Sequence, residues 1–250
     1  MANPEHLAKL KKSLKAWNAW RFDNLNLEVD LCDAELSGAN LIGANLSSVD
    51  LSGANLDEAN LSGTYLNGTR LSGAKLREAD LTEAQLIDAD LRKADLKEAK
   101  LNRAKLTGAR LEGADLSGAN LFESYLDRAN LFNSNLSGAN LIKAYLPRAD
   151  FKSSNLSEAD LAFADLSGAF LSETNLSGAD LIGANLRSAF LDGANLRGAN
   201  LSEANLSMAD LSGADLTLAS LSGALLVRSN LKMQSWRAAL FMASLRGISI

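Results

Sequence analysis

This chain of 250 residues has almost none of the residues that form disulfides or zinc sites. It contains one cysteine, Cys32, and one histidine, His6. A single cysteine excludes an intramolecular disulfide and fits a reducing cytosol, and one residue of each kind cannot supply a zinc site. No apolar run approaches the roughly 20 residues of a membrane helix, and the first residues do not resemble a signal peptide. We therefore expect a cytoplasmic protein without a metal or a membrane span.

Residues suited to catalysis are equally scarce. The chain after Cys32 contains no histidine that would activate its thiol. His6 stands near the N-terminus, where we interpret it as a surface residue or as part of a cap interface. Twelve of the thirty acidic residues directly precede a leucine of the repeat, and the glycines occur singly rather than in a phosphate-binding loop. We expect neither enzymatic activity nor a cofactor.

The chain does contain a regular repeat of leucine at every fifth position. Leucine or phenylalanine occupies every fifth position from Leu31 to Leu231, and forty of these forty-one residues are leucine, the exception being Phe151. Ala, Val, Thr or Ser stands two residues before each one. A helix advances about 100° per residue and a strand alternates its faces, so neither would bury residues that are five apart. The period requires a chain that turns a corner in every repeat.

Each repeat has the residues for such a turn. Ala39 and Leu41 share one face of a short extended segment, while Asn40 between them points the other way. Pairs such as Ser52-Gly53 follow the leucine, and Ser and Gly suit turn conformations. The pattern predicts a coil of short extended sides around a leucine core.

The repeating unit Ala-(Asp/Asn)-Leu-Ser-Gly, as in Ala179-Asp180-Leu181, resembles the pentapeptide-repeat proteins over residues 29–231. The resemblance implies an all-β solenoid, namely a right-handed quadrilateral β-helix with four repeats per coil. About ten coils would then make a rod roughly 50 Å long at a strand spacing of about 4.8 Å. Large outward residues recur at the same 20-residue spacing: Phe122 with Ile142, Tyr125 with Tyr145, and Phe170 with Phe190.

Residues 1–24 lack the repeat. We expect them to form an N-terminal helical cap on a β-helix that comprises residues 25–231. Asn3 suits an N-cap and Pro4 the first helical position. Apolar residues then follow at helical spacing, which predicts one amphipathic helix over residues 4–20. An open β-helix exposes a strand edge at its end, so covering that end is favoured over binding to membranes or calmodulin-like partners. The stretch from Trp17 to Arg21 resembles a lead-in of some bacterial members of the family.

Residues 232–250 predict a short apolar C-terminal cap or dimerisation segment. Trp236 and Phe241 replace leucine in the five-residue frame, and a helix from Ser235 would stop at Gly247. The segment is too apolar for solvent, so it either covers the last coil or pairs with a second copy. The resemblance implies the second option as well, because the quinolone-resistance members of the family dimerise through their C-terminal ends.

The net charge of −5 is distributed in bands along the chain. Residues 1–21 carry +4, residues 22–69 carry −8, residues 70–110 carry +3 and the remainder carries −4. No basic stretch outweighs its acidic neighbours, so direct nucleic-acid binding is not expected.

Three classes of function follow, and the catalytic class has no candidate residues. We expect a non-enzymatic rigid scaffold or regulatory module that binds another protein. The alternative implied by the resemblance is a DNA mimic that modulates a type II topoisomerase. Duplex DNA carries one charge per about 1.7 Å, so a net charge of −5 imitates it poorly. The chain also lacks the loops that interrupt the repeats of the quinolone-resistance proteins.

The candidate partner surface consists of large apolar residues at outward positions. Stacked aromatics support one another along a rod, but adjoining exposed apolar groups on a polar background also mark interfaces. We expect this surface, rather than the acidic band, to be buried in a complex. The candidates are Phe122, Tyr125, Ile142, Tyr145, Phe163, Phe170, Ile182 and Phe190.

Overall fold

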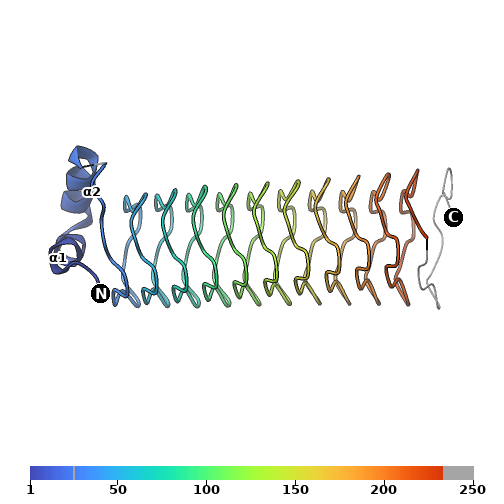
Figure 1. Ribbon diagram of the computed structural model, residues 1–250, viewed down its shortest axis with the longest axis horizontal. Coiled ribbons are helices and arrows are strands. Elements are labelled where there is room, and N and C mark those ends of the chain that lie inside the picture. Colours follow the sequence, from blue (N-terminus) through green and yellow to red (C-terminus); the bar gives the residue numbers. More distant parts are fainter. Residues whose placement is uncertain (25, 233–250) are drawn as a thin grey trace.

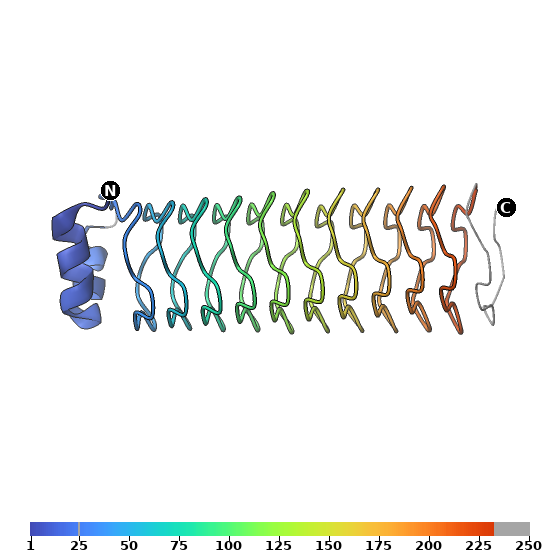
Figure 2. The same cartoon turned by 90° about the horizontal axis from the view of Figure 1, so that it is seen from below.

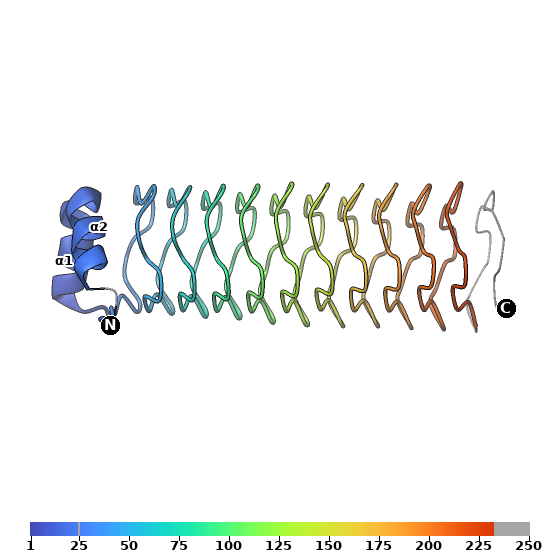
Figure 3. The same ribbon diagram turned by 90° about the horizontal axis from the view of Figure 1, so that it is seen from above.

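A computed structural model describes residues 1–24 and 26–232. The chain forms a rod in which coils follow one another along a straight axis, with the helices α1 and α2 at the N-terminal end (Figure 1). Both helices lie across the end of the rod rather than along it (Figure 2 and Figure 3). Neither helix is long and apolar enough to span a bilayer. The predicted C-terminal segment, with Trp236 and Phe241, lies outside the described residues, apart from its first residue.

The coil repeats every 20 residues, which confirms the spacing predicted from the sequence. Parallel single-residue bridges join the residue before each leucine to the residue 20 positions later, from Asp30 with Asp50 to Asp210 with Asn230. No longer strand forms within residues 26–232. Each coil therefore consists of four repeats and has four sides.

Backbone hydrogen bonds hold each side to the next coil. The N–H of Leu116 donates to the carbonyl of Asn135 at 2.7 Å, and the N–H of Asn135 donates to the carbonyl of Ala114 at 3.0 Å. The same pair of bonds recurs through the rod, so each coil contacts mainly its two neighbours.

The leucines and the small residues two positions before them fill the interior. Leu116 and Phe151 are fully buried, and most of the alanines are too. Where Ser or Thr replaces Ala, its hydroxyl is satisfied inside the core: Thr69 Oγ1 donates to the carbonyl of Leu46 at 2.7 Å, and Ser124 Oγ donates to that of Leu121 at 2.7 Å. A buried hydroxyl without such a partner would be costly, so these bonds explain why the small position accepts both kinds of residue.

The second residue after each leucine has a left-handed backbone in every repeat from Asp33 to Arg228. Gly73 has a φ of +65°, and Glu83 in the same position of another repeat has a φ of 58°. Glycine adopts this conformation freely, whereas other L-residues are strained in it. The repeat thus imposes one backbone shape on residues with very different preferences.

Glu83→Gly is expected to stabilise the protein by about 1 kcal/mol, because it removes the left-handed strain of an exposed side chain. Gly73→Ala is expected to cost a similar amount, although no atom lies within 4 Å of the added Cβ. Urea unfolding of the purified variants measures both. Thr82→Gly is the control: Thr82 has no positive φ, so this change should lower stability. Equal effects of Glu83→Gly and Thr82→Gly would contradict the strain argument.

The N-terminal segment forms two helices, α1 (Pro4–Lys12) and α2 (Leu14–Asp23), so the prediction of one helix over residues 4–20 was wrong. Ser13 separates them with an extended backbone (φ −169°, ψ 124°), and its side-chain oxygen accepts from the N–H of Ala16 at 3.3 Å. A serine that caps a new helix competes with continuation of the old one. The predicted cap of α1 is confirmed, since the Asn3 side chain accepts from the N–H of Glu5 at 2.9 Å.

Candidate functional site

Helix α2 binds the open end of the β-helix through side chains. The indole Nε1 of Trp17, which is fully buried, donates to the carbonyl of Asn45 at 2.9 Å. The Oδ1 of Asn18 accepts from the N–H of the same Asn45 at 2.8 Å. In later coils, backbone groups of the preceding coil make the corresponding bonds, as between Tyr65 N–H and the carbonyl of Ala44. The side chains of Trp17 and Asn18 therefore make the hydrogen bonds to Asn45 that the backbone of a preceding coil makes elsewhere in the rod.

Arg21 completes this contact as a buried cation. Its side chain is only 1% exposed, and its guanidinium donates to the carbonyl oxygens of Ser47 at 2.8 Å, Asn24 at 3.2 Å and Leu27 at 3.4 Å. Burial lowers the pKa of this guanidinium. Within the described residues it has no carboxylate partner, so backbone carbonyls alone hold its charge.

Helix α1 contributes a second contact at the same end. The N–H of Asp30 donates to Nδ1 of His6 at 3.3 Å, and the carbonyl of Asp30 accepts from the N–H of Asn3 at 3.0 Å. His6 is therefore a cap-interface residue, in line with the interpretation from sequence. The motif of Trp17, Asn18 and Arg21 could be noticed in the sequence, but its hydrogen bonds to the first coil could not.

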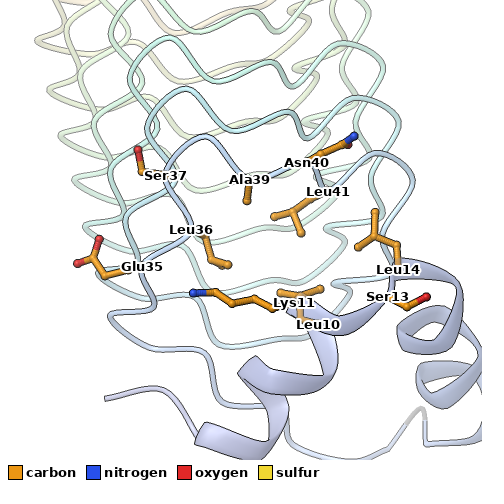
Figure 4. A pocket seen from close by; sticks show the side chains of 10 residues that line it. All are labelled: Leu10, Lys11, Ser13, Leu14, Glu35, Leu36, Ser37, Ala39, Asn40 and Leu41. Carbon is orange, nitrogen blue, oxygen red and sulfur yellow. The ribbon is translucent and has the colours of Figure 1, made fainter.

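A crevice of about 280 Å³ lies between the helices and the first coil (Figure 4). Leu10 and Leu14 face it from the helices, and Leu36 and Leu41 face it from the coil (Figure 4). Lys11 and Glu35 also line it, but they form no ion pair with each other. We interpret the crevice as a gap left where helices pack against a coil.

Cys32 lies in an environment that suppresses its reactivity. Burial raises the pKa of its thiol to about 12, and the carboxylates of Asp50 and Asp30 act in the same direction. Although burial opposes it, hydrogen bonds from Ser52, Cys32 and Arg70 hold the pKa of Asp50 at about 2. A thiol that stays protonated beside a carboxylate is a poor nucleophile. Nor do three or more potential metal ligands gather anywhere in the part of the chain that the structure describes.

The coil register places the predicted surface residues on two parts of the rod. Tyr125 and Tyr145 lie one above the other on one side, 48% and 45% exposed, with ring centroids 6.3 Å apart and planes at 58°. We call this side the tyrosine face. The corner next to it carries Phe122, Ile142, Phe163 and Ile182.

Phe170 and Phe190 belong to the next side of the rod and do not join the tyrosine face. Their rings are parallel within 6° and 5.2 Å apart, and Nζ of Lys152 lies 4.9 Å from the Phe170 ring. Offset parallel rings at this distance support each other along the rod. Ring stacking therefore explains why Phe170 and Phe190 occupy these outward positions, without a binding partner.

Phe163 is the most exposed of the candidates, at 58%, but it also packs along the rod. A Cβ atom on Gly183, one coil further on, would lie 2.6 Å from the Phe163 ring. The ring therefore covers the backbone at Gly183, and the glycine makes room for it. Its outward position does not by itself indicate a contact with a partner.

Sequence reasoning missed several exposed apolar residues. Tyr65 stands on the tyrosine face three coils earlier, but Gln85 follows it one coil later, so no aromatic pair drew attention to it. The outward position was itself the signal, because the residue before each leucine and the two corner residues after it lie outside the core. The residues missed are Ile42, Tyr65, Phe132, Met208, Leu218, Leu225 and Val227.

Comparison with known proteins identifies relatives over most of the chain. The family model described as pentapeptide repeats matches in eight copies that together cover residues 28–232. No curated protein matches the chain. Among solved structures it is similar to HetL, a pentapeptide repeat protein involved in heterocyst differentiation regulation from the cyanobacterium Nostoc sp. strain PCC 7120. The two are 42% identical over 78% of this chain and 87% of HetL, with a TM-score of 0.76.

Two further structures show weaker similarity. Rfr23, a pentapeptide repeat protein from the cyanobacterium Cyanothece 51142, is 38% identical over 45% of this chain and 63% of its own, with a TM-score of 0.21. Full-length QnrB1, a plasmid-mediated fluoroquinolone resistance protein, is 17% identical over 84% of this chain and 92% of its own, with a TM-score of 0.46.

Proposed function

Since this chain belongs to the pentapeptide-repeat family, whose members fold as right-handed quadrilateral β-helices, we propose that it is a non-enzymatic, rigid regulatory scaffold that acts by binding another protein. Its similarity to HetL supports a regulatory role, because HetL is involved in regulating differentiation. The observation that carries the proposal is the tyrosine face, where Tyr125 and Tyr145 are both nearly half exposed and lie next to each other.

The rod presents these two rings in a fixed arrangement. Tyr125 and Tyr145 are joined by a backbone bridge, and the leucines on either side of each are fully buried. A surface that is already ordered loses little conformational entropy when a partner binds. Tyrosine is also enriched among the residues that dominate binding energies. Both properties favour this face as the contact with a partner.

The chemistry of the chain supports a binding role over a catalytic one. Its cysteine has a pKa raised to about 12, and the imidazole of His6 is engaged with the backbone of Asp30. Neither side chain is set up to act as a nucleophile or as a general base.

Tyr125→Ser combined with Tyr145→Ser is expected to weaken partner binding by about 30-fold or more, if the two rings together contribute about 2 kcal/mol. The melting transition should change little, because both rings point away from the core. Affinity capture from the source cell, followed by titration of the captured protein, measures the first effect, and circular dichroism measures the second.

The matched control is Phe132→Ser combined with Phe190→Ser, which removes two aromatic rings that are 46% and 44% exposed and lie on other parts of the rod. This control should bind the partner normally. Unchanged capture by the Tyr125 and Tyr145 variant, or loss of capture together with loss of folding, would show that the tyrosine face is structural.

The DNA-mimic alternative rests on the acidic band of residues 22–69. In the structure these carboxylates do not form one strip, because the register places Asp50, Glu35 and Asp57 on different parts of the rod. Asp50 is also paired with Arg70 at 2.8 Å. A supercoiling assay with purified gyrase distinguishes the two functions. Only a DNA mimic would change the supercoiling activity of gyrase without a further partner protein.

A further inference from the structure

The tyrosine face is framed by basic side chains. Lys105 lies on the same side and forms the backbone bridge with Tyr125. Arg128 and Arg148 stand one coil apart on one bounding corner, and Arg103 and Lys143 stand two coils apart on the other. All five side chains are exposed, so a molecule that covers the two rings can reach them.

Two carboxylates beside these basic residues are already engaged. Glu123 accepts from Nε of Arg103 at 2.9 Å, and Asp127 accepts from Oγ1 of Thr107 at 2.6 Å. Among the described residues, Lys105 and Arg148 have no carboxylate partner. This face therefore has an excess of positive charge although the whole chain carries a net charge of −5.

A shallow hollow of about 330 Å³ adjoins Tyr145, between Arg128 and Arg148. Pro147 and Ser167 also line it, as does Asp127, whose Oδ2 lies 3.6 Å from the Arg128 guanidinium. The backbones of the two arginines are one coil apart, which corresponds to about 4.8 Å. Planar guanidinium groups bind carboxylates through paired hydrogen bonds, so this hollow suits an acidic side chain.

We propose that the partner binds here through an acidic polypeptide segment. Its carboxylates meet Lys105, Arg128 and Arg148, and an apolar side chain of the segment covers the rings of Tyr125 and Tyr145. The inference rests on the proposed function and adds the chemistry of the partner. Complementary charge around an aromatic centre is the arrangement that gives protein interfaces their specificity.

A nucleic-acid strand fits this face less well. The two rings are tilted by 58° and do not form a parallel stacking platform. Asp165 follows Tyr145 on the same side one coil further on, so the basic frame ends there. A nucleic-acid strand that binds through several nucleotides would extend over the Asp165 carboxylate, which repels its phosphates.

The experiment uses three short fluorescent peptides with identical leucine and phenylalanine positions. The positions between them carry Asp and Glu in the first peptide, Asn and Gln in the second, and Lys in the third. Fluorescence polarisation with the full-length protein should show that the acidic peptide binds at least about tenfold more tightly than the amide peptide. Its affinity should fall as salt is added, because the charges are exposed.

Arg128→Glu combined with Arg148→Glu is expected to weaken binding of the acidic peptide at least about tenfold, and Lys105→Glu alone should weaken it less. The matched control is Lys75→Glu combined with Arg197→Glu. It makes the same change in net charge at exposed residues away from the tyrosine face, and it should leave binding unchanged. Thermal melting confirms that each variant is folded.

Several outcomes would overturn the inference: equal binding of the acidic and amide peptides, no binding of the acidic peptide up to about 1 mM, or equal losses in the two double variants. Tighter binding of a single-stranded oligonucleotide than of the acidic peptide would overturn it as well. The proposed function fails separately, through the capture experiment with Tyr125→Ser and Tyr145→Ser. A partner lost with the tyrosines but retained by Arg128→Glu and Arg148→Glu would leave that function standing and reject the acidic segment.

Discussion

Leu116→Asp is expected to disrupt the middle of the rod and to lower its stability by at least several kcal/mol. Leu116 is fully buried, and the coils on either side place Leu96 and Leu136 directly above and below it. The change removes about 1.5–3 kcal/mol of leucine burial. It also leaves a carboxylate without a partner in an apolar column, which costs far more unless the group takes up a proton. Because coils contact mainly their neighbours, the damage should spread to adjacent coils before the rest of the rod.

Circular dichroism melting of three variants tests this expectation. Ser117→Asp adds the same charge one residue further on, at a corner that is open to solvent, and should change the melting temperature little. Leu116→Met keeps an apolar side chain of similar volume and should cost less than about 1.5 kcal/mol. If Leu116→Asp and Ser117→Asp lost equal stability, the assignment of inward and outward positions would be wrong.

The coil could be predicted from the sequence because its rule is local and repeats without interruption. Each leucine needs burial, the small residue two positions before it needs the same side, and the residue between them must point outward. The rule is less strict in the first coil. Ala39 occupies an inward position there, but it is only partly buried because the cap covers it incompletely. The 20-residue register then places every outward residue relative to its neighbours.

The remaining features depend on interactions that the period does not encode. Ser13 divides the N-terminal segment into two helices because its side chain can cap a new one, a choice that apolar spacing does not reveal. The basic frame of the tyrosine face is not visible in the charge along the chain, since Lys105, Arg128 and Arg148 are far apart in sequence and come together only through the 20-residue register. The strained backbone at Glu83 likewise reflects the demand of the coil rather than the preference of the residue.

Removing the cap contacts is expected to have the other large effect, and to act on association as well as stability. Trp17→Ala combined with Arg21→Ala deletes a buried ring, at a cost of about 3–5 kcal/mol, and leaves the carbonyls of Asn45 and Ser47 without their donors. Hydrogen exchange should increase first in the coils nearest the N-terminus, because the helices then detach without unfolding the distant coils.

An uncovered first coil presents unpaired backbone groups and the leucine core to other molecules, as the edge of an open sheet does. Light scattering should therefore show concentration-dependent self-association of the double variant, and of a protein that lacks residues 1–21. Phe22→Ala is the control on the same helix, because Phe22 is 76% exposed, and that variant should behave like the unmodified protein. A truncated protein that kept the scattering of the unmodified chain at high concentration would mean that the helices do not protect the end. Trp17 and Arg21 would then stabilise the first coil without controlling association.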